Sequence, residues 1–211
     1  MGLLKITEIM KAKLFLTVVA LMLCCSLYAQ NATQAKRILD KTAAIVGRKG
    51  GAAADFTISG GSYRRTGGSI AIKGSKFMAS TPQVKVWYDG RTQWSYTKST
   101  DEVNVSRPTE AQRAAMNPYS FVTMYRSGYN LSMKIINGAY RIHLQATNKS
   151  RSVQQMYITI GKNYLPMTVK LLQGKHWTTI NIRNFHAKNQ SDALFVFPAK
   201  AYPNAEIIDL R

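Results

Sequence analysis

The stretch Val84-Lys-Val-Trp-Tyr-Asp-Gly-Arg-Thr-Gln-Trp-Ser-Tyr-Thr97 places two runs of alternating side chains on either side of an Asp-Gly pair. Asp-Gly tolerates positive φ at both central positions of a two-residue turn, which makes it a strong signal for a β-hairpin. Val84 and Val86 alternate with polar or aromatic neighbours, and Trp94 and Tyr96 share one side of the second run. Successive strand residues point to opposite faces, so this segment is predicted to be a hairpin with an apolar face.

The same alternation recurs on both sides of this hairpin. Asn137-Gly138 supplies a second turn of the same kind. About ten such segments joined by short turns predict an antiparallel meander that curls into a barrel or half-barrel. The apolar positions of the other segments are Phe56 and Ile58; Ile70 and Ile72; Val103 and Val105; Leu131, Met133 and Ile135; Tyr140, Ile142 and Leu144; Met156, Ile158 and Ile160; Met167, Val169 and Leu171; Ile180 and Ile182.

Helical patterns precede the strands at one place and interrupt them at another. Residues 32–46 carry apolar side chains at helical spacing, with Asn31 as a cap, so an amphipathic helix must lie on an apolar surface there. Thr109-Glu-Ala-Gln112 matches a capping box, and Asn117-Pro118 begins a second short helix. This mid-chain helical insert is either a lid over the concave face of the sheet or a plug at the end of a barrel.

Two further segments complete the sequence-based prediction. The glycines from Gly60 to Gly68, with Arg64 and Arg65 between them, predict a mobile basic loop. Leu194-Phe-Val-Phe197 predicts the last strand, after a polar loop.

The first 29 residues are typical of a cleaved secretory signal peptide. Lys11 and Lys13 precede an apolar run, and Ala29 offers a cleavage site. Both cysteines, Cys24 and Cys25, lie in this segment, so the alternative is a lipid-anchored N-terminus. Cleavage would leave a single cysteine-free domain at 30–211, which is expected in the periplasm and is long enough to bury an ordinary core.

The net charge of the chain indicates which kinds of partner it can attract. The signal segment carries three lysines and one glutamate, so a chain starting at Gln30 retains +17 of the formal net charge of +19. This excess favours anionic membrane surfaces or acidic proteins, and no nucleic-acid recognition motif is present. The exposed bases can equally serve solubility alone.

Enzymatic function finds no support in the sequence. The three histidines have no metal-ligand spacing, and no nucleophile elbow is present. No catalytic residue, metal site or cofactor is therefore predicted.

Several motifs follow one another along almost the whole predicted domain. In this order they resemble the LolA-like family of outer-membrane lipoprotein carriers. Where that family carries an arginine after its second strand, this chain has Gly74-Ser75 flanked by Lys73 and Lys76. The motifs are Ala54-Asp-Phe-Thr57; Gly68 to Lys73; Lys76-Phe77 ahead of Pro82; Val86 to Gly90 followed by Gln93 to Tyr96; Asn117-Pro118; and Phe195 to Asp209.

The resemblance implies a fold and a function. The fold is α+β and mainly β: a single antiparallel, unclosed half-barrel whose concave apolar face is covered by an N-terminal helix and mid-chain helices. The function is that of a monomeric periplasmic carrier that takes lipoprotein acyl chains from an inner-membrane release complex to an outer-membrane acceptor. The alternatives are a binding protein for another amphiphile, such as a glycolipid or fatty acid, and an interaction protein that uses its basic surface.

The alternating apolar positions supply the predicted wall of an acyl cavity. Methionines suit an adaptable wall, although each one alone is more typical of core packing. Trp94 and Tyr96 fit either a cavity wall or a packed core. The predicted acyl-binding residues are Phe56, Ile58, Ile70, Ile72, Phe77, Val84, Val86, Trp94, Tyr96, Val103, Val105, Phe121, Met124, Leu131, Met133, Ile142, Met156, Ile158, Met167 and Val169.

Overall fold

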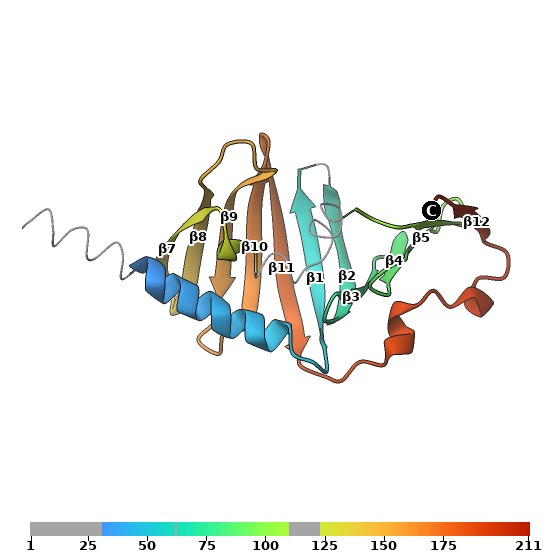
Figure 1. Cartoon of the computed structure of the whole chain (residues 1–211), viewed down its shortest axis with the longest axis horizontal. Coiled ribbons are helices and arrows are strands. Elements are labelled where there is room, and N and C mark those ends of the chain that lie inside the picture. The colour runs from blue at the N-terminus through green and yellow to red at the C-terminus, as the bar shows by residue number, and fades with distance from the viewer. Residues whose placement is uncertain (1–30, 62, 110–122) are drawn as a thin grey trace, which may run out of the picture.

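The computed structural model describes residues 31–61, 63–109 and 123–211, and within them the architecture is one open β-sheet with a helix across one face (Figure 1). The helix spans residues 31–46. Three 3₁₀ turns accompany the strands: η1 (Met124–Arg126), η2 (Asp192–Phe195) and η3 (Ala199–Ala201). The strands are β1 (Ala52–Gly60), β2 (Tyr63–Lys73), β3 (Lys76–Ser80), β4 (Val84–Tyr88), β5 (Gln93–Thr97), β6 (Glu102–Ser106), β7 (Tyr129–Ile136), β8 (Ala139–Ala146), β9 (Val153–Ile160), β10 (Pro166–Gln173), β11 (His176–His186) and β12 (Glu206–Asp209).

The twelve strands form the order β12-β6-β5-β4-β3-β2-β1-β11-β10-β9-β8-β7. Each pair is antiparallel except β12 with β6, which is parallel. Strands β7 and β12 lie at opposite ends of this order and do not pair with each other, so the sheet is unclosed. The predicted α+β class with an open, mainly antiparallel sheet is confirmed. The predicted mid-chain helix falls in 110–122, outside the described residues.

Hairpins lie at both predicted places, but only Asn137-Gly138 is a two-residue turn; Tyr88 pairs with Gln93, so the first hairpin has the longer loop 89–92. The Asp89 carboxylate accepts hydrogen bonds from the backbone N–H groups of Arg91, at 2.8 Å, and Thr92, at 2.7 Å, and Gly90 has φ of +103°. Asn137 and Gly138 have φ values of +50° and +76°. Glycine and a few short polar residues tolerate positive φ, which explains Gly90 and Asn137-Gly138. Asp89 contributes through its side-chain hydrogen bonds and does not have positive φ.

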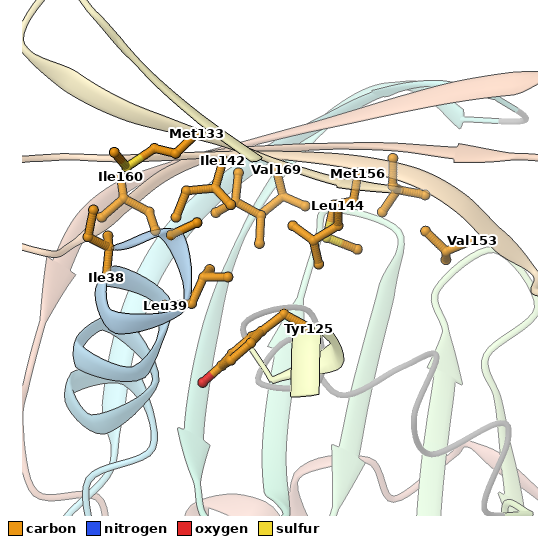
Figure 2. Close-up of a cluster of buried hydrophobic side chains, with 13 residues drawn as sticks. Ile38, Leu39, Tyr125, Met133, Ile142, Leu144, Val153, Met156, Ile160 and Val169 are labelled. Atoms are coloured by element: carbon orange, nitrogen blue, oxygen red, sulfur yellow. The ribbon is translucent and has the colours of Figure 1, made fainter. Parts of the chain in front are cut away.

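The helix buries its apolar stripe against the sheet, as its periodicity predicts. Ala35, Ile38 and Leu39 pack on the side chains of β7 to β10, and Tyr125 of η1 joins them (Figure 2). Burial of an aliphatic side chain of this size contributes about 1.5–3 kcal/mol. Farther along the helix, Ala43 and Val46 belong to a second cluster with β1 to β4. The helix thus bridges two apolar clusters on one face of the sheet.

Two local predictions are wrong. Arg64 and Arg65 belong to strand β2 and not to a mobile loop, because Gly67 and Gly68 pair in register with β1. The segment 194–197 is not a strand. Its first part completes η2, in which Ser191 Oγ accepts a hydrogen bond from Ala193 N.

The segment after β11 crosses to the opposite face of the sheet from the helix. The rings of Phe197 and Tyr202 lie 5.4 Å and 5.7 Å from the ring of Trp87, and Tyr202 lies 4.6 Å from Tyr96. Trp87 points away from the face occupied by its neighbour Val86, because adjacent strand residues alternate. Residues 195–202 therefore form a strap, and β12 follows it to pair with β6.

Candidate functional site

A cavity of about 690 Å³ lies on the helix-bearing face of the sheet. Its volume falls within the range of about 300–1,000 Å³ that is typical of small-molecule sites. The adjacent strands β2, β1, β11 and β10 form a continuous wall of the cavity, with contributions from β3 to β5, η1 and the loop before β9. The central apolar residues of the lining are Phe56, Ile58, Ile70, Ile72, Phe77, Val86, Val169, Leu171, Ile180 and Ile182.

The cavity exists because the helix covers only part of the apolar face. Beneath the helix, Ile142 and Ile158 are 0% exposed. Beyond it, Phe56, Ile70 and Ile180 are only half-buried, although their side chains are just as apolar. Apolar side chains that the described part of the chain leaves uncovered mark a candidate binding surface.

Glycine shapes one part of this wall. Gly68 pairs with Phe56 across β1 and β2, and a Cβ on Gly68 would approach the Phe56 ring to 2.9 Å. The same Cβ would lie 2.1 Å from Ser80 O. The absent side chain therefore leaves room for the Phe56 ring and for β3.

Polar groups occupy separate places in the lining. On β5, Gln93 Nε2 donates to Ser95 Oγ at 3.1 Å, and no described residue bonds to Gln93 Oε1. At the loop before β9, the Arg151 guanidinium lies 4.8 Å from the centre of the Tyr129 ring. The cavity is thus an apolar space with a few localised polar groups, the arrangement that orients ligands in small-molecule sites.

Within the described ranges, no three His, Cys, Asp or Glu side chains come together as metal ligands would. None of the helices in that part of the chain combines the length and apolar content needed to cross a membrane.

The family model for outer membrane lipoprotein carrier protein LolA matches residues 25–175. The match spans well over half of the 211 residues and includes most of the cavity wall. The chain belongs to the LolA family. Strand β11 and the strap lie beyond the matched residues. A search of curated protein sequences finds no match.

Solved structures of similar fold have low sequence identity to this LolA-family chain. An uncharacterized conserved protein from Thermus thermophilus is 14% identical with a TM-score of 0.55, covering 83% of this chain and 99% of its own. A putative outer membrane lipoprotein-sorting protein domain from Vibrio parahaemolyticus is 11% identical, with a TM-score of 0.46 and coverages of 82% and 99%. A LolA superfamily protein from Nitrosomonas europaea is 11% identical, with a TM-score of 0.43 and coverages of 77% and 97%. The Thermus structure supports the fold alone.

The predicted acyl-binding residues fall into several groups. One group lines the cavity, and its members come from β1 to β4, η1 and β10. They are Phe56, Ile58, Ile70, Ile72, Phe77, Val86, Met124 and Val169.

A second group packs beneath the helix and not in the cavity lining. Met133 is 8% exposed, whereas Ile142, Met156 and Ile158 are 0% exposed; Leu131 packs against the same cluster. Figure 2 shows Met133, Ile142 and Met156 on the sheet above the helix and η1. These side chains have the predicted orientation, but the helix fills the space in front of them.

A third group lies on the opposite face. Val86 pairs with Ser95, and Trp94 pairs with Trp87, so Trp94 and Tyr96 face away from the cavity. Val103 and Val105 pair with Tyr96 and Trp94 and share that orientation. The prediction that these four residues line the cavity together with Val86 is wrong. The strand register places Gln93 and Ser95, and not Trp94 and Tyr96, on the cavity side of β5.

Two of the remaining predicted residues do not line the cavity, and the third lies outside the described part of the chain. Val84 is 37% exposed, and Met167 is 49% exposed beside a register shift between Pro166 and Thr168. Phe121 lies outside the described residues. A bulge adds an unpaired residue to a strand, and this explains why the alternation of β10 misplaces Met167.

Sequence reasoning missed several lining residues. Ile180 and Ile182 show the same alternation as the chosen positions and could have been included on that basis. Gln93, Tyr129 and Arg151 belong to no apolar pattern, and only the folded chain brings them to the cavity.

The lysines that flank the turn after β2 have a structural role. Lys73 Nζ and Lys76 Nζ lie 3.1 Å and 2.8 Å from the carboxylate of Asp192, at the start of η2. Hydrogen bonds from Lys76 and Lys73 lower the pKa of the Asp192 carboxyl. At the place where the resemblance implied a family arginine, this chain therefore ties the β2–β3 turn to the segment that leads into the strap.

Proposed function

We propose that this LolA-family chain is an exported carrier that shelters acyl chains of lipoproteins in the cavity over β2, β1, β11 and β10. The observation that carries the proposal is the half-buried state of Phe56, Ile70 and Ile180 around about 690 Å³ of space. The family description, an outer membrane lipoprotein carrier, supports lipoproteins as the cargo.

The energetics favour shelter of an acyl chain. Each methylene removed from water contributes about 0.8 kcal/mol, so a cavity that takes ten methylenes gains about 8 kcal/mol before ordering costs. A carrier must also release its cargo. Because the cavity is already open, a bound acyl chain can contact its lining, and leave it again, without displacing the side chains that pack beneath the helix.

The proposed route follows from this role. The protein would receive cargo at an inner-membrane release complex and deliver it to an outer-membrane acceptor, acting as a monomer in the periplasm. The high positive charge would favour approach to anionic membrane surfaces, worth about 1 kcal/mol for each basic residue close to the membrane.

Native mass spectrometry of protein purified from its own cell envelope tests the cargo. An acylated polypeptide bound to the chain supports the proposal. A glycolipid or fatty acid would instead support carriage of another amphiphile. A chain that carries no adduct, and binds no added acyl probe, would point to an interaction protein and contradict the proposal.

A matched pair of variants tests the cavity. Ile58 lines it, whereas Ser59 is the next residue of β1 and faces the other way. Ile58→Glu should lower the affinity for a fluorescent acyl probe by at least about tenfold, because the bound hydrocarbon chain would remove water from the new carboxylate. Ser59→Glu should bind like the wild type. Equal affinities in two variants with wild-type melting temperatures would remove β1 from the binding wall.

A further inference from the structure

Arg151 is a cation in the lining of a cavity that is otherwise almost entirely apolar. The residue lies in the loop between β8 and β9, next to Ser152, which is exposed and also lines the cavity. Arg151 therefore marks the place where the apolar space meets solvent.

The guanidinium is held in a formed site. Its centre lies 4.8 Å from the ring of Tyr129, and the Tyr129 hydroxyl donates to Val153 O at 2.9 Å. A Cβ on Gly128 would come within 2.2 Å of Arg151 Nη2, and Gly128 has φ of +74°. Glycine at this position thus leaves space that the guanidinium occupies.

The loop is also fixed by short-range hydrogen bonds. The Asn148 side chain accepts from Ser150 N at 2.9 Å and from Ser150 Oγ at 2.8 Å. Arg151 N donates to Asn148 O at 3.2 Å. A preorganised arginine loses less conformational entropy when it binds a ligand.

The charge of Arg151 is not neutralised within the described part of the chain. The ion pairs there join Lys36 to Asp40, Lys73 and Lys76 to Asp192, and Arg211 to Asp209. Asp55 is the other charged side chain in the described lining, and it accepts a hydrogen bond from Asn184 Nδ2 at 2.7 Å. An arginine that no carboxylate of the described residues pairs with, at the end of an apolar cavity, is suited to an anionic group.

We propose that Arg151, with the Ser152 hydroxyl beside it, binds the anionic headgroup of an amphiphile whose chain occupies the cavity. The headgroup is a carboxylate or a phosphate, because the planar guanidinium donates paired hydrogen bonds to either. This inference rests on the proposed acyl-binding cavity, and it assigns to that cavity a ligand with its own anionic headgroup, which belongs to the class of other amphiphiles and not to the acyl chains of a lipoprotein.

Chain-matched ligands test the headgroup site in the protein that starts at Gln30. Laurate, dodecyl phosphate and dodecanol would be compared by displacement of a fluorescent acyl probe, with inorganic phosphate as a chain-free anion. The wild type should bind laurate and dodecyl phosphate about tenfold more tightly than dodecanol, the effect of one charge-assisted hydrogen bond. Arg151→Gln should remove this preference and leave the affinity for dodecanol unchanged. Arg141→Gln, on the exposed side of β8, should retain it.

The outcomes separate this inference from the function on which it rests. Equal wild-type affinities for the three ligands would overturn the headgroup site and leave acyl binding intact. Equal loss of preference in both arginine variants would also overturn it, since the effect would then come from overall charge. Inorganic phosphate that binds as tightly as dodecyl phosphate would overturn it too, because the anion site would then be independent of the cavity. Failure of the wild type to bind any ligand would overturn both proposals.

Discussion

The side-chain amide of Asn31 makes hydrogen bonds with both the backbone N–H and the backbone C=O of Met133. Asn31 Oδ1 accepts from Met133 N at 2.6 Å, and Asn31 Nδ2 donates to Met133 O at 3.0 Å. Strand β7 is an end strand of the sheet, so the helix start occupies backbone groups that would otherwise be open to another strand. Asn31, which the sequence suggested as a helix cap, thus fastens the helix to the sheet edge.

Asn31→Ala should lower the free energy of unfolding by about 1–2 kcal/mol, because two hydrogen bonds are lost. The amide of Met133 should also exchange with solvent much faster. Denaturant unfolding and hydrogen exchange measure the two effects. Asn130→Ala, at an exposed position of the same strand, is the control. An unchanged exchange rate at Met133 would show that Asn31 does not protect the edge.

Removal of the Tyr202 ring should destabilise the strap without affecting the cavity. Tyr202 contacts Trp87 and Tyr96, and Lys85 Nζ donates to its hydroxyl at 3.0 Å. Tyr202→Ala should cost about 2–3 kcal/mol of unfolding free energy, less than the roughly 3–5 kcal/mol typical of a fully buried aromatic ring, because this ring is half-buried. Tyr202→Phe should cost less than about 1 kcal/mol. Affinity for an acyl probe should stay the same in both, since the cavity lies on the other face; a large loss of affinity would argue against that separation.

His143 should make stability depend on pH. Burial lowers the pKa of this histidine below 6.5, and its ring stacks on Tyr157 at 4.4 Å. The folded state favours the neutral ring, so this contribution is full above pH 6.5 and is lost as the pH falls through 6.5 toward the folded-state pKa.

His143→Phe keeps an aromatic ring and should flatten the loss of stability between about pH 8 and about pH 5. Denaturant midpoints across this range supply the measurement. His176→Phe, at the exposed start of β11, should retain the wild-type slope because His143 is still present. A wild-type slope in His143→Phe would exclude His143 as its source.

Affinity for single-chain ligands should rise with chain length and then stop rising. Each added methylene contributes about 0.8 kcal/mol, or about fourfold in affinity, while it finds apolar wall. A cavity of about 690 Å³ is finite, so longer chains should gain nothing further. Displacement titrations with saturated carboxylates of increasing length test this. Affinity that does not change with length would mean that the chain does not enter the cavity.

Much of the fold follows from local patterns. Alternation and the Asp89-Gly90 and Asn137-Gly138 dipeptides predicted the hairpins, and helical spacing over 32–46 predicted the helix that the structure has at 31–46. These features depend on neighbours a few residues apart, which a sequence displays directly. The parallel pairing of β12 with β6 was not predictable in this way, because it joins segments about a hundred residues apart.

The candidate site, like the fold, was predictable from local sequence patterns only in part. Period-two alternation placed the apolar residues Phe56, Ile70 and Ile142 on the apolar face of the sheet, but it does not show which part of the chain packs against each of them. Packing of the helix over Ile142 made core there and left Phe56 and Ile70 beside open space. Strand register placed Trp94 on the strap's side of the sheet, and the β8–β9 loop brought Arg151 to the cavity. Local sequence thus determined the strands and their apolar positions, whereas long-range packing decided which positions are core, which face the strap and which remain available to a ligand.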